Sequence, residues 1–120
     1  MGNIVRDETK EIPPERWTQW FDTFTNSNAG RSVRITLIDD ELGDETLTSG
    51  AALVAIDYDS ADKGNDFVIS YGDKQAPSHH TIQAPVRLWQ GQDENGLVVS
   101  LEIEDESGRH TILSLLGENL

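Results

Sequence analysis

The fold of this chain is decided by residues 13–24, PPERWTQWFDTF, the one stretch with a convincing helical period. Its large aromatic residues recur at spacings of three, four and seven, which places them on one face of an α-helix. These residues are Trp17, Trp20, Phe21 and Phe24. Proline suits the first helical turn, and the stretch 26–30 carries the Asn and Gly residues that end a helix. Four aromatics on one face need a partner surface, so we expect this face to be core.

The remainder of the chain has the pattern of short strands separated by turns. Apolar and polar residues alternate in several stretches, as in half-buried strands, whereas residues 51–58 are apolar on both faces and predict a central strand. The expected strands are 33–38, 51–58, 67–71, 79–84, 86–89, 97–104 and 109–116. The expected turns and loops are 39–49, 59–66, 72–78, 93–96 and 105–108.

These elements predict an α+β domain. We expect one N-terminal amphipathic helix packed on a curved, mainly antiparallel sheet of about six strands, and a partial barrel is one form that fits. Residues 1–11 lack periodicity and are expected to be a flexible N-terminal arm, with residues 12–120 as a single α+β domain.

The composition excludes several classes of partner and site. The 120 residues include 22 acidic and 9 basic ones, for a formal net charge of -13. Nucleic acid and anionic membranes both need clustered Lys and Arg, so neither is an expected partner. The absence of cysteine removes disulfides, zinc-thiolate sites and thiol nucleophiles. No signal segment or membrane-length apolar run is seen, which predicts a soluble cytoplasmic protein whose oligomeric state is open.

Two histidines are the candidate metal ligands. His80 and His110 stand in or beside expected strands, and with a nearby carboxylate they would suit zinc or another transition metal if those strands meet. The alternative is local hydrogen bonding at strand ends. The acidic stretches 39–45 and 57–64 are more typical of solvated loops than of calcium sites, because the second lacks the EF-hand oxygen ligands and turn glycine.

Catalytic signatures are missing from the sequence. Neither a Gly-x-Ser-x-Gly elbow nor a glycine-rich phosphate loop occurs, and nothing selects one carboxylate pair from the many. We therefore assign no catalytic residue and no cofactor, and favour a protein that is not an enzyme. Trp89 beside Arg87 is the best candidate for an exposed recognition anchor.

Several stretches, in their order along the chain, resemble a known family. They are IPPERW at 12–17, FDTF at 21–24, HTIQAPVR at 80–87, LEIE at 101–104 and SGRHTIL at 107–113. From residue 11 onward the chain resembles the small bacterial domain-of-unknown-function family 5335. The resemblance implies a bacterial, soluble, single-domain protein, and it brings neither an activity nor catalytic residues.

The sequence thus favours a non-enzymatic protein-binding or accessory domain, which would use a sheet edge or the surface at Trp89 and Arg87. Its acidic loops are expected to exclude acidic partners. The alternative is a small metal-binding protein or enzyme that uses His80, His110 and nearby carboxylates. A purely structural or solubility role is a third hypothesis that no sequence feature selects.

Overall fold

The computed structural model describes residues 8–41, 43–59 and 61–116, which form one α-helix, two 3-10 turns and eight β-strands. The helical elements are η1 (Pro14–Arg16), α1 (Trp17–Asn28) and η2 (Ala61–Lys63). The strands are β1 (Glu8–Glu11), β2 (Ser32–Asp39), β3 (Gly43–Asp59), β4 (Asp66–Asp73), β5 (Ala76–Gln83), β6 (Pro85–Gln92), β7 (Val98–Asp105) and β8 (His110–Leu115). The chain is therefore mostly strand with one short helix, in agreement with the predicted α+β class.

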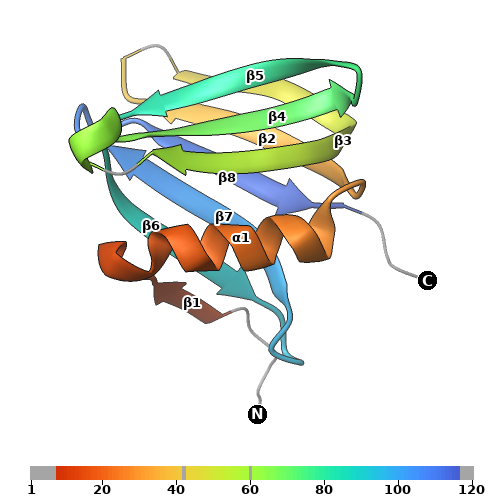
Figure 1. The fold of residues 1–120 in the computed structure, drawn as a ribbon, viewed down its shortest axis with the longest axis horizontal. Coiled ribbons are helices and arrows are strands. Elements are labelled where there is room, and N and C mark those ends of the chain that lie inside the picture. Colours follow the sequence, from red (N-terminus) through yellow and green to blue (C-terminus); the bar gives the residue numbers. More distant parts are fainter. Residues whose placement is uncertain (1–7, 42, 60, 117–120) are drawn as a thin grey trace.

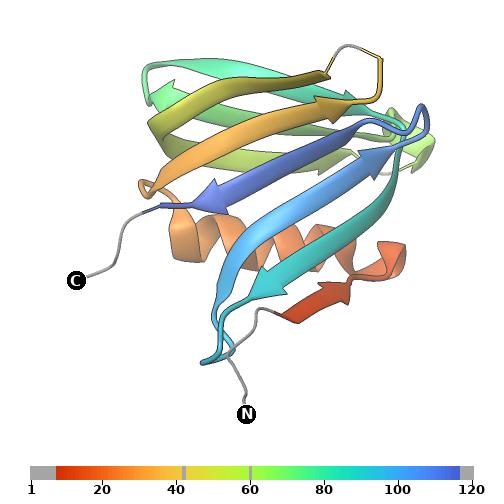
Figure 2. The same cartoon turned by 180° about the vertical axis from the view of Figure 1, so that it is seen from behind.

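The strands form one sheet in the order β1-β6-β7-β8-β2-β3-β4-β5, and every neighbouring pair is antiparallel. Strands β1 and β5 are its two edges and do not pair with each other in the described residues, so the sheet is not closed (Figure 2). Within those residues no helix is long and apolar enough to cross a membrane.

Strand β3 folds the sheet back on itself. Residues 43–52 pair with β2, and residues 53–59 pair with β4. Register shifts interrupt both ladders, and Gly50 has a φ of 123°, a conformation that suits glycine at a bend. The bend brings β4 and β5 in front of β2 and β8, and α1 lies along the concave side of the sheet (Figures 1 and 2).

The aromatic face of α1 fills this concavity. Trp17, Phe21 and Phe24 are buried, and the ring of Phe21 lies 4.5 Å from that of Phe67 on β4. The indole N–H of Trp17 donates to the carbonyl of Ile12 at 2.8 Å, which satisfies the one polar group that this ring takes into the core. The predicted core face is therefore confirmed for three of its four aromatics, while Trp20 is half-buried at the edge.

The sheet has eight strands, and the expectation of about six is wrong. Residues 8–11, which we expected in the flexible arm, form β1 against β6, and residues 1–7 of that arm lie outside the described residues. The stretch 43–49, expected as part of an acidic loop, is the first part of β3. Neither strand has apolar alternation, because β1 is a short charged edge and the start of β3 is mainly exposed.

The helical boundaries also differ from the prediction. Pro14–Arg16 form a 3-10 turn, and the α-helix begins at Trp17 and continues to Asn28. The side chain of Asn28 donates to the carbonyl of Phe24 at 3.0 Å, so a residue expected to end the helix belongs to its last turn. The chain then reverses at Gly30, whose φ is 93°.

Candidate functional site

Trp89, the predicted recognition anchor, does not stand free on the surface. It is half-buried on the outer face of β6, and its ring stacks on that of His110 with centroids 6.2 Å apart and planes at 9°. Arg87 is exposed on the same strand and lies opposite Glu104 in the register of β6 and β7. One face of the Trp89 indole is therefore already covered by His110.

His110 has partners on two sides. Its Nδ1 lies 2.7 Å from Oε2 of Glu102 on the neighbouring strand β7, and its ring lies against Trp89. His110, Glu102 and Trp89 therefore form a cross-strand cluster on the outer face of the sheet.

His80 lies on the opposite, concave side of the sheet. Its Nε2 is 3.3 Å from the Oγ1 of Thr111, a buried residue of β8. Because successive side chains of a strand point to opposite faces, His110 and Thr111 face opposite ways, and the structure does not bring His80 and His110 together. Among the described residues no three His, Asp or Glu side chains are grouped as a metal site would require.

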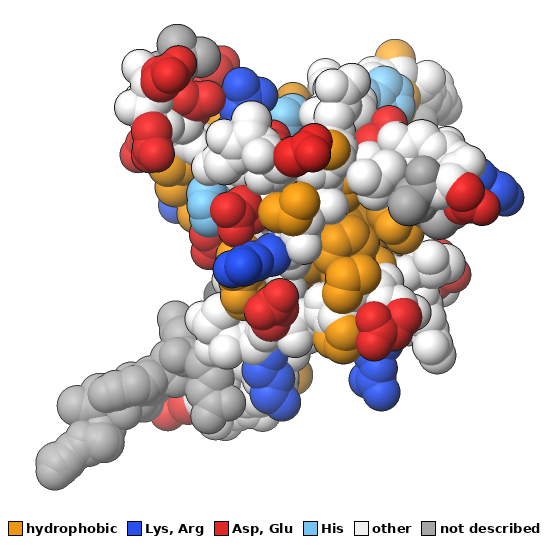
Figure 3. Space-filling view, turned by 90° about the vertical axis from the view of Figure 1, so that its left-hand side faces the viewer, with side chains coloured by type: hydrophobic (Ala, Val, Ile, Leu, Met, Phe, Trp, Pro, Cys, Tyr) orange, Lys and Arg blue, Asp and Glu red, His pale blue; other side chains and the backbone are white. Residues whose placement is uncertain are grey.

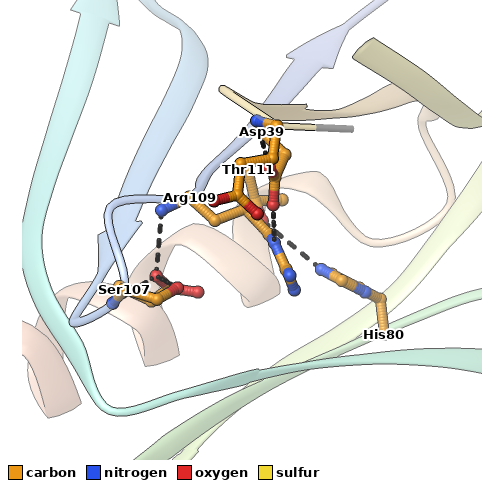
Figure 4. Close-up of polar contacts among 7 residues, drawn as sticks. Asp39, His80, Ser107, Arg109 and Thr111 are labelled. Atoms are coloured by element: carbon orange, nitrogen blue, oxygen red, sulfur yellow. Dashed lines mark hydrogen bonds and ion pairs between the residues drawn. The ribbon is translucent and has the colours of Figure 1, made fainter. Parts of the chain in front are cut away.

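An ion pair lies beside the contact between His80 and Thr111 (Figure 4). Arg109 precedes Thr111 by two residues, and its Nε lies 3.1 Å from Oδ2 of Asp39 at the end of β2. Burial lowers the pKa of His80, the Arg109 guanidinium lowers it further, and the Glu45 carboxylate acts in the opposite direction. Burial and the Arg109 guanidinium thus favour the neutral form of the His80 imidazole.

A groove of about 760 Å³ lies on another side of the molecule, between α1 and the start of β7. We call it the α1 groove. Its lining residues are Arg16, Gln19, Trp20, Thr23, Phe24, Ser27, Asn28, Arg31, Gly96, Leu97 and Val98. The volume lies within the range of pockets that bind small molecules.

The helical wall of the α1 groove follows from the spacing of its residues. Positions 16, 20, 23 and 27 lie on one stripe of a helix, beside the stripe that enters the core. Trp20 is fixed there because its indole N–H donates to Oε1 of the buried Gln90 at 3.0 Å and its ring stacks on Phe24 with centroids 5.2 Å apart. The aromatic surface is therefore already formed before any ligand arrives.

The opposite wall comes from the turn between β6 and β7. Oδ1 of Asp93 accepts hydrogen bonds from the backbone N–H groups of Asn95 and Leu97, at 2.8 and 3.0 Å, and this holds the predicted turn in place. Leu97 follows the turn and is 61% exposed, and among the described residues the other exposed large hydrophobic side chain is Val86 at 44%. A residue that we expected at the start of a strand thus presents its side chain to the groove.

The α1 groove was not predicted from the sequence, because its two walls are about 70 positions apart in the chain. The usable signal was partial: Trp20 stands at the margin of the aromatic stripe and shares a helix face with Arg16 and Thr23. Nothing local to residues 96–98 indicated that they meet this helix.

Comparisons with known proteins agree with the resemblance seen in the sequence. A protein of Aquifex aeolicus (strain VF5), described as an uncharacterized protein, is 27% identical over 107 residues, which is 89% of this chain and 91% of the relative. No solved structure matches the chain. The profile of a family of unknown function matches residues 8–118, nearly the whole chain, and the protein therefore belongs to that family, DUF5335.

Proposed function

We propose that this protein is a non-enzymatic binding domain that holds a segment of a partner protein in the α1 groove. The observation that carries the proposal is the position of Leu97. It is the most exposed large hydrophobic residue among those described, and it lines the same groove as the half-buried Trp20. Apolar side chains that converge on a concave surface are typical of interface centres.

The rigidity of both walls supports this proposal. Trp20 is held by Gln90, and Leu97 follows a turn that Asp93 closes. A preformed site loses little conformational entropy when a partner binds, so a modest groove can still give useful affinity. The surface at Trp89 and Arg87 is a weaker candidate, because Trp89 already stacks on His110.

A displayed library of random peptides, selected on the full chain, tests the proposal. Peptides enriched on the wild type are synthesised and their affinities measured by calorimetry, in buffer with and without a chelator. Leu97→Ser removes the apolar side chain from the α1 groove, and Val86→Ser is the matched control, since Val86 is also exposed but does not line the groove.

We expect Leu97→Ser to weaken binding at least tenfold, the size of a hot-spot contact, and Val86→Ser to leave the affinity unchanged. Affinity that survives Leu97→Ser but is lost in Trp89→Ala would move the site to the outer face. Binding that is lost with the chelator would favour the metal-dependent alternative at His80 or His110. Failure to enrich any peptide would reject the groove as a peptide-binding site.

A further inference from the structure

We infer that the segment bound in the α1 groove is acidic, with carboxylates on both sides of a central apolar side chain. This inference rests on the proposed function and adds the chemical class of the partner. The carrying observation is a contrast in charge. The chain has 22 acidic and 9 basic residues, yet among the residues that the structure describes the groove is lined by two arginines and by neither Asp nor Glu.

The rest of the surface makes this contrast informative. Acidic side chains recur across the face drawn in Figure 3, with basic ones among them. A net charge of -13 repels an acidic partner from most approaches. Because arginines line the groove and no described carboxylate does, an acidic segment can bind there despite the negative potential of the protein as a whole.

Both arginines have capacity for a new partner. Arg16 is exposed, and Arg31 is half-buried with its Nη1 donating to the neutral Oδ1 of Asn28 at 3.2 Å. Within the described residues the ion pairs are Arg109 with Asp39 and His110 with Glu102, so neither groove arginine is paired with a carboxylate there. A guanidinium carries five N–H donors, and an incoming carboxylate can accept two of them at once.

The position of Arg16 is unfavourable for the free helix. It is the N-cap of α1 and makes no side-chain capping hydrogen bond. A cation at the N-terminus opposes the helix dipole, whereas an anion there is favoured. Glu15 offsets part of this charge but does not line the groove. The turn η1 precedes Arg16, and the backbone N–H groups of Arg16 and Trp17 donate to the carbonyls of Pro13 and Pro14, so it is the guanidinium of Arg16 that would meet a bound carboxylate.

The spacing of the arginines sets the size of the segment. They stand at opposite ends of α1, whose 12 residues correspond to a length of about 18 Å. An extended peptide rises about 3.3 Å per residue, so five or six residues cover this distance. The expected partner has two acidic positions roughly five residues apart, with an apolar residue between them facing Trp20 and Leu97.

The selected peptide library tests this inference separately from the proposed function. Pools enriched on the wild type are sequenced and compared with pools enriched on the Arg16→Gln, Arg31→Gln double variant. The matched control is the Arg34→Gln, Arg87→Gln double variant, which removes two exposed arginines that do not line the groove.

We expect wild-type pools to be enriched in Asp and Glu around an apolar residue, despite the acidity of the protein. An enriched acidic peptide should bind about two- to fivefold more weakly to each groove single variant, more weakly still to the double variant, and equally well to the control. Added salt should weaken wild-type binding towards that of the double variant.

If the enriched peptides are neutral or basic and their binding still depends on Leu97, the inference of an acidic partner is wrong and the proposed binding function still holds. The inference is also wrong if acidic peptides are enriched but bind equally well to the wild type and to the Arg16→Gln, Arg31→Gln double variant. Loss of enrichment on every form of the protein would reject the proposed function together with the inference.

Discussion

Nε2 of His80 and Oγ1 of Thr111 lie 3.3 Å apart, and this contact joins the edge strand β5 to β8 across the concave interior of the sheet. In the sheet order, three strands lie between the two. The contact therefore spans the bend made by β3, which places β5 and β8 on its two sides (Figure 1). The contact is polar and includes a titratable group, so its contribution to stability depends on pH.

The first prediction is that stability falls in mildly acidic solution because of His80. Its pKa is lower in the folded chain than the ordinary value of 6.5, chiefly through burial and then through Arg109. The unfolded chain therefore takes up this proton more readily than the folded one. The contribution of His80 to the free energy of unfolding is fully present above pH 6.5 and is lost as the pH falls through the folded-state pKa.

Urea unfolding of the wild type and of His80→Gln at several pH values between 5 and 8 measures this contribution. Glutamine keeps hydrogen-bonding capacity and does not titrate, so the variant should show a shallower loss of stability towards acid. His79→Gln is the control, since His79 faces the other side of β5 and contacts Ser70. Parallel curves for wild type and His80→Gln would refute the assignment.

The core of this fold was predictable because it depends on local pattern. Large aromatics at helical spacing indicated α1 and its buried face, and Trp17, Phe21 and Phe24 occupy the positions expected of them. The Asp-initiated turns before Gly96 and Gly108 were equally local. In these places the residues that form the structure are neighbours in the chain.

The candidate site was not predictable because it depends on distant pairs. Trp20 and Gln90 are 70 positions apart, and His80 and Thr111 are 31 apart. Strand β1 has no apolar residue in its sequence ETKE, so only its pairing with β6 identifies it as a strand. A single sequence carries the propensity of each element but not the partner that each one meets.

The second prediction concerns backbone strain between β5 and β6. Ala84 has a φ of 52°, its N–H donates to the carbonyl of Asn65, and its carbonyl accepts from Glu106. A left-handed backbone conformation costs an alanine about 1–2 kcal/mol, and replacement by glycine removes this cost. Part of the gain is lost because glycine also gives the unfolded chain more conformational freedom. Ala84→Gly should therefore raise the free energy of unfolding by about 0.5–1 kcal/mol.

Chemical unfolding of Ala84→Gly beside Ala76→Gly checks this value. Ala76 is an exposed residue of β5 with negative φ, and glycine there should lower stability by about 0.5–1 kcal/mol. If both replacements destabilise the chain equally, Ala84 is not strained.

The third prediction addresses the metal alternative. His80 on β5 lies on the concave side of the sheet, and His110 on β8 lies on its outer face. They therefore do not supply two ligands to one ion, and added Zn²⁺ or Co²⁺ should leave the melting temperature unchanged. Thermal unfolding with metal and with chelator measures this for the wild type, His80→Gln and His110→Gln. A metal-dependent rise that each single replacement abolishes would show a shared site and reverse the ordering of the two functional hypotheses.

The fourth prediction is that Trp20 and Gln90 are coupled, and that their hydrogen bond shapes the α1 groove. Gln90 is buried, and its Oε1 is the acceptor for the indole N–H of Trp20 at 3.0 Å. Trp20→Phe removes the donor, and Gln90→Met removes the acceptor while keeping similar length. A double-mutant cycle from urea unfolding should give a coupling of about 0.5–1.5 kcal/mol, since each single variant leaves one partner unsatisfied.

The same cycle separates stability from binding. If the hydrogen bond holds the indole in its binding position, Gln90→Met should weaken the binding of an enriched peptide, although Gln90 does not line the groove. The reason is that the Trp20 side chain, once released, must be ordered again when the peptide binds. Ser70→Ala serves as the control, since it removes another buried polar group far along the sheet, on β4. Equal peptide affinity in Gln90→Met and wild type would mean that packing on Phe24 alone fixes the ring.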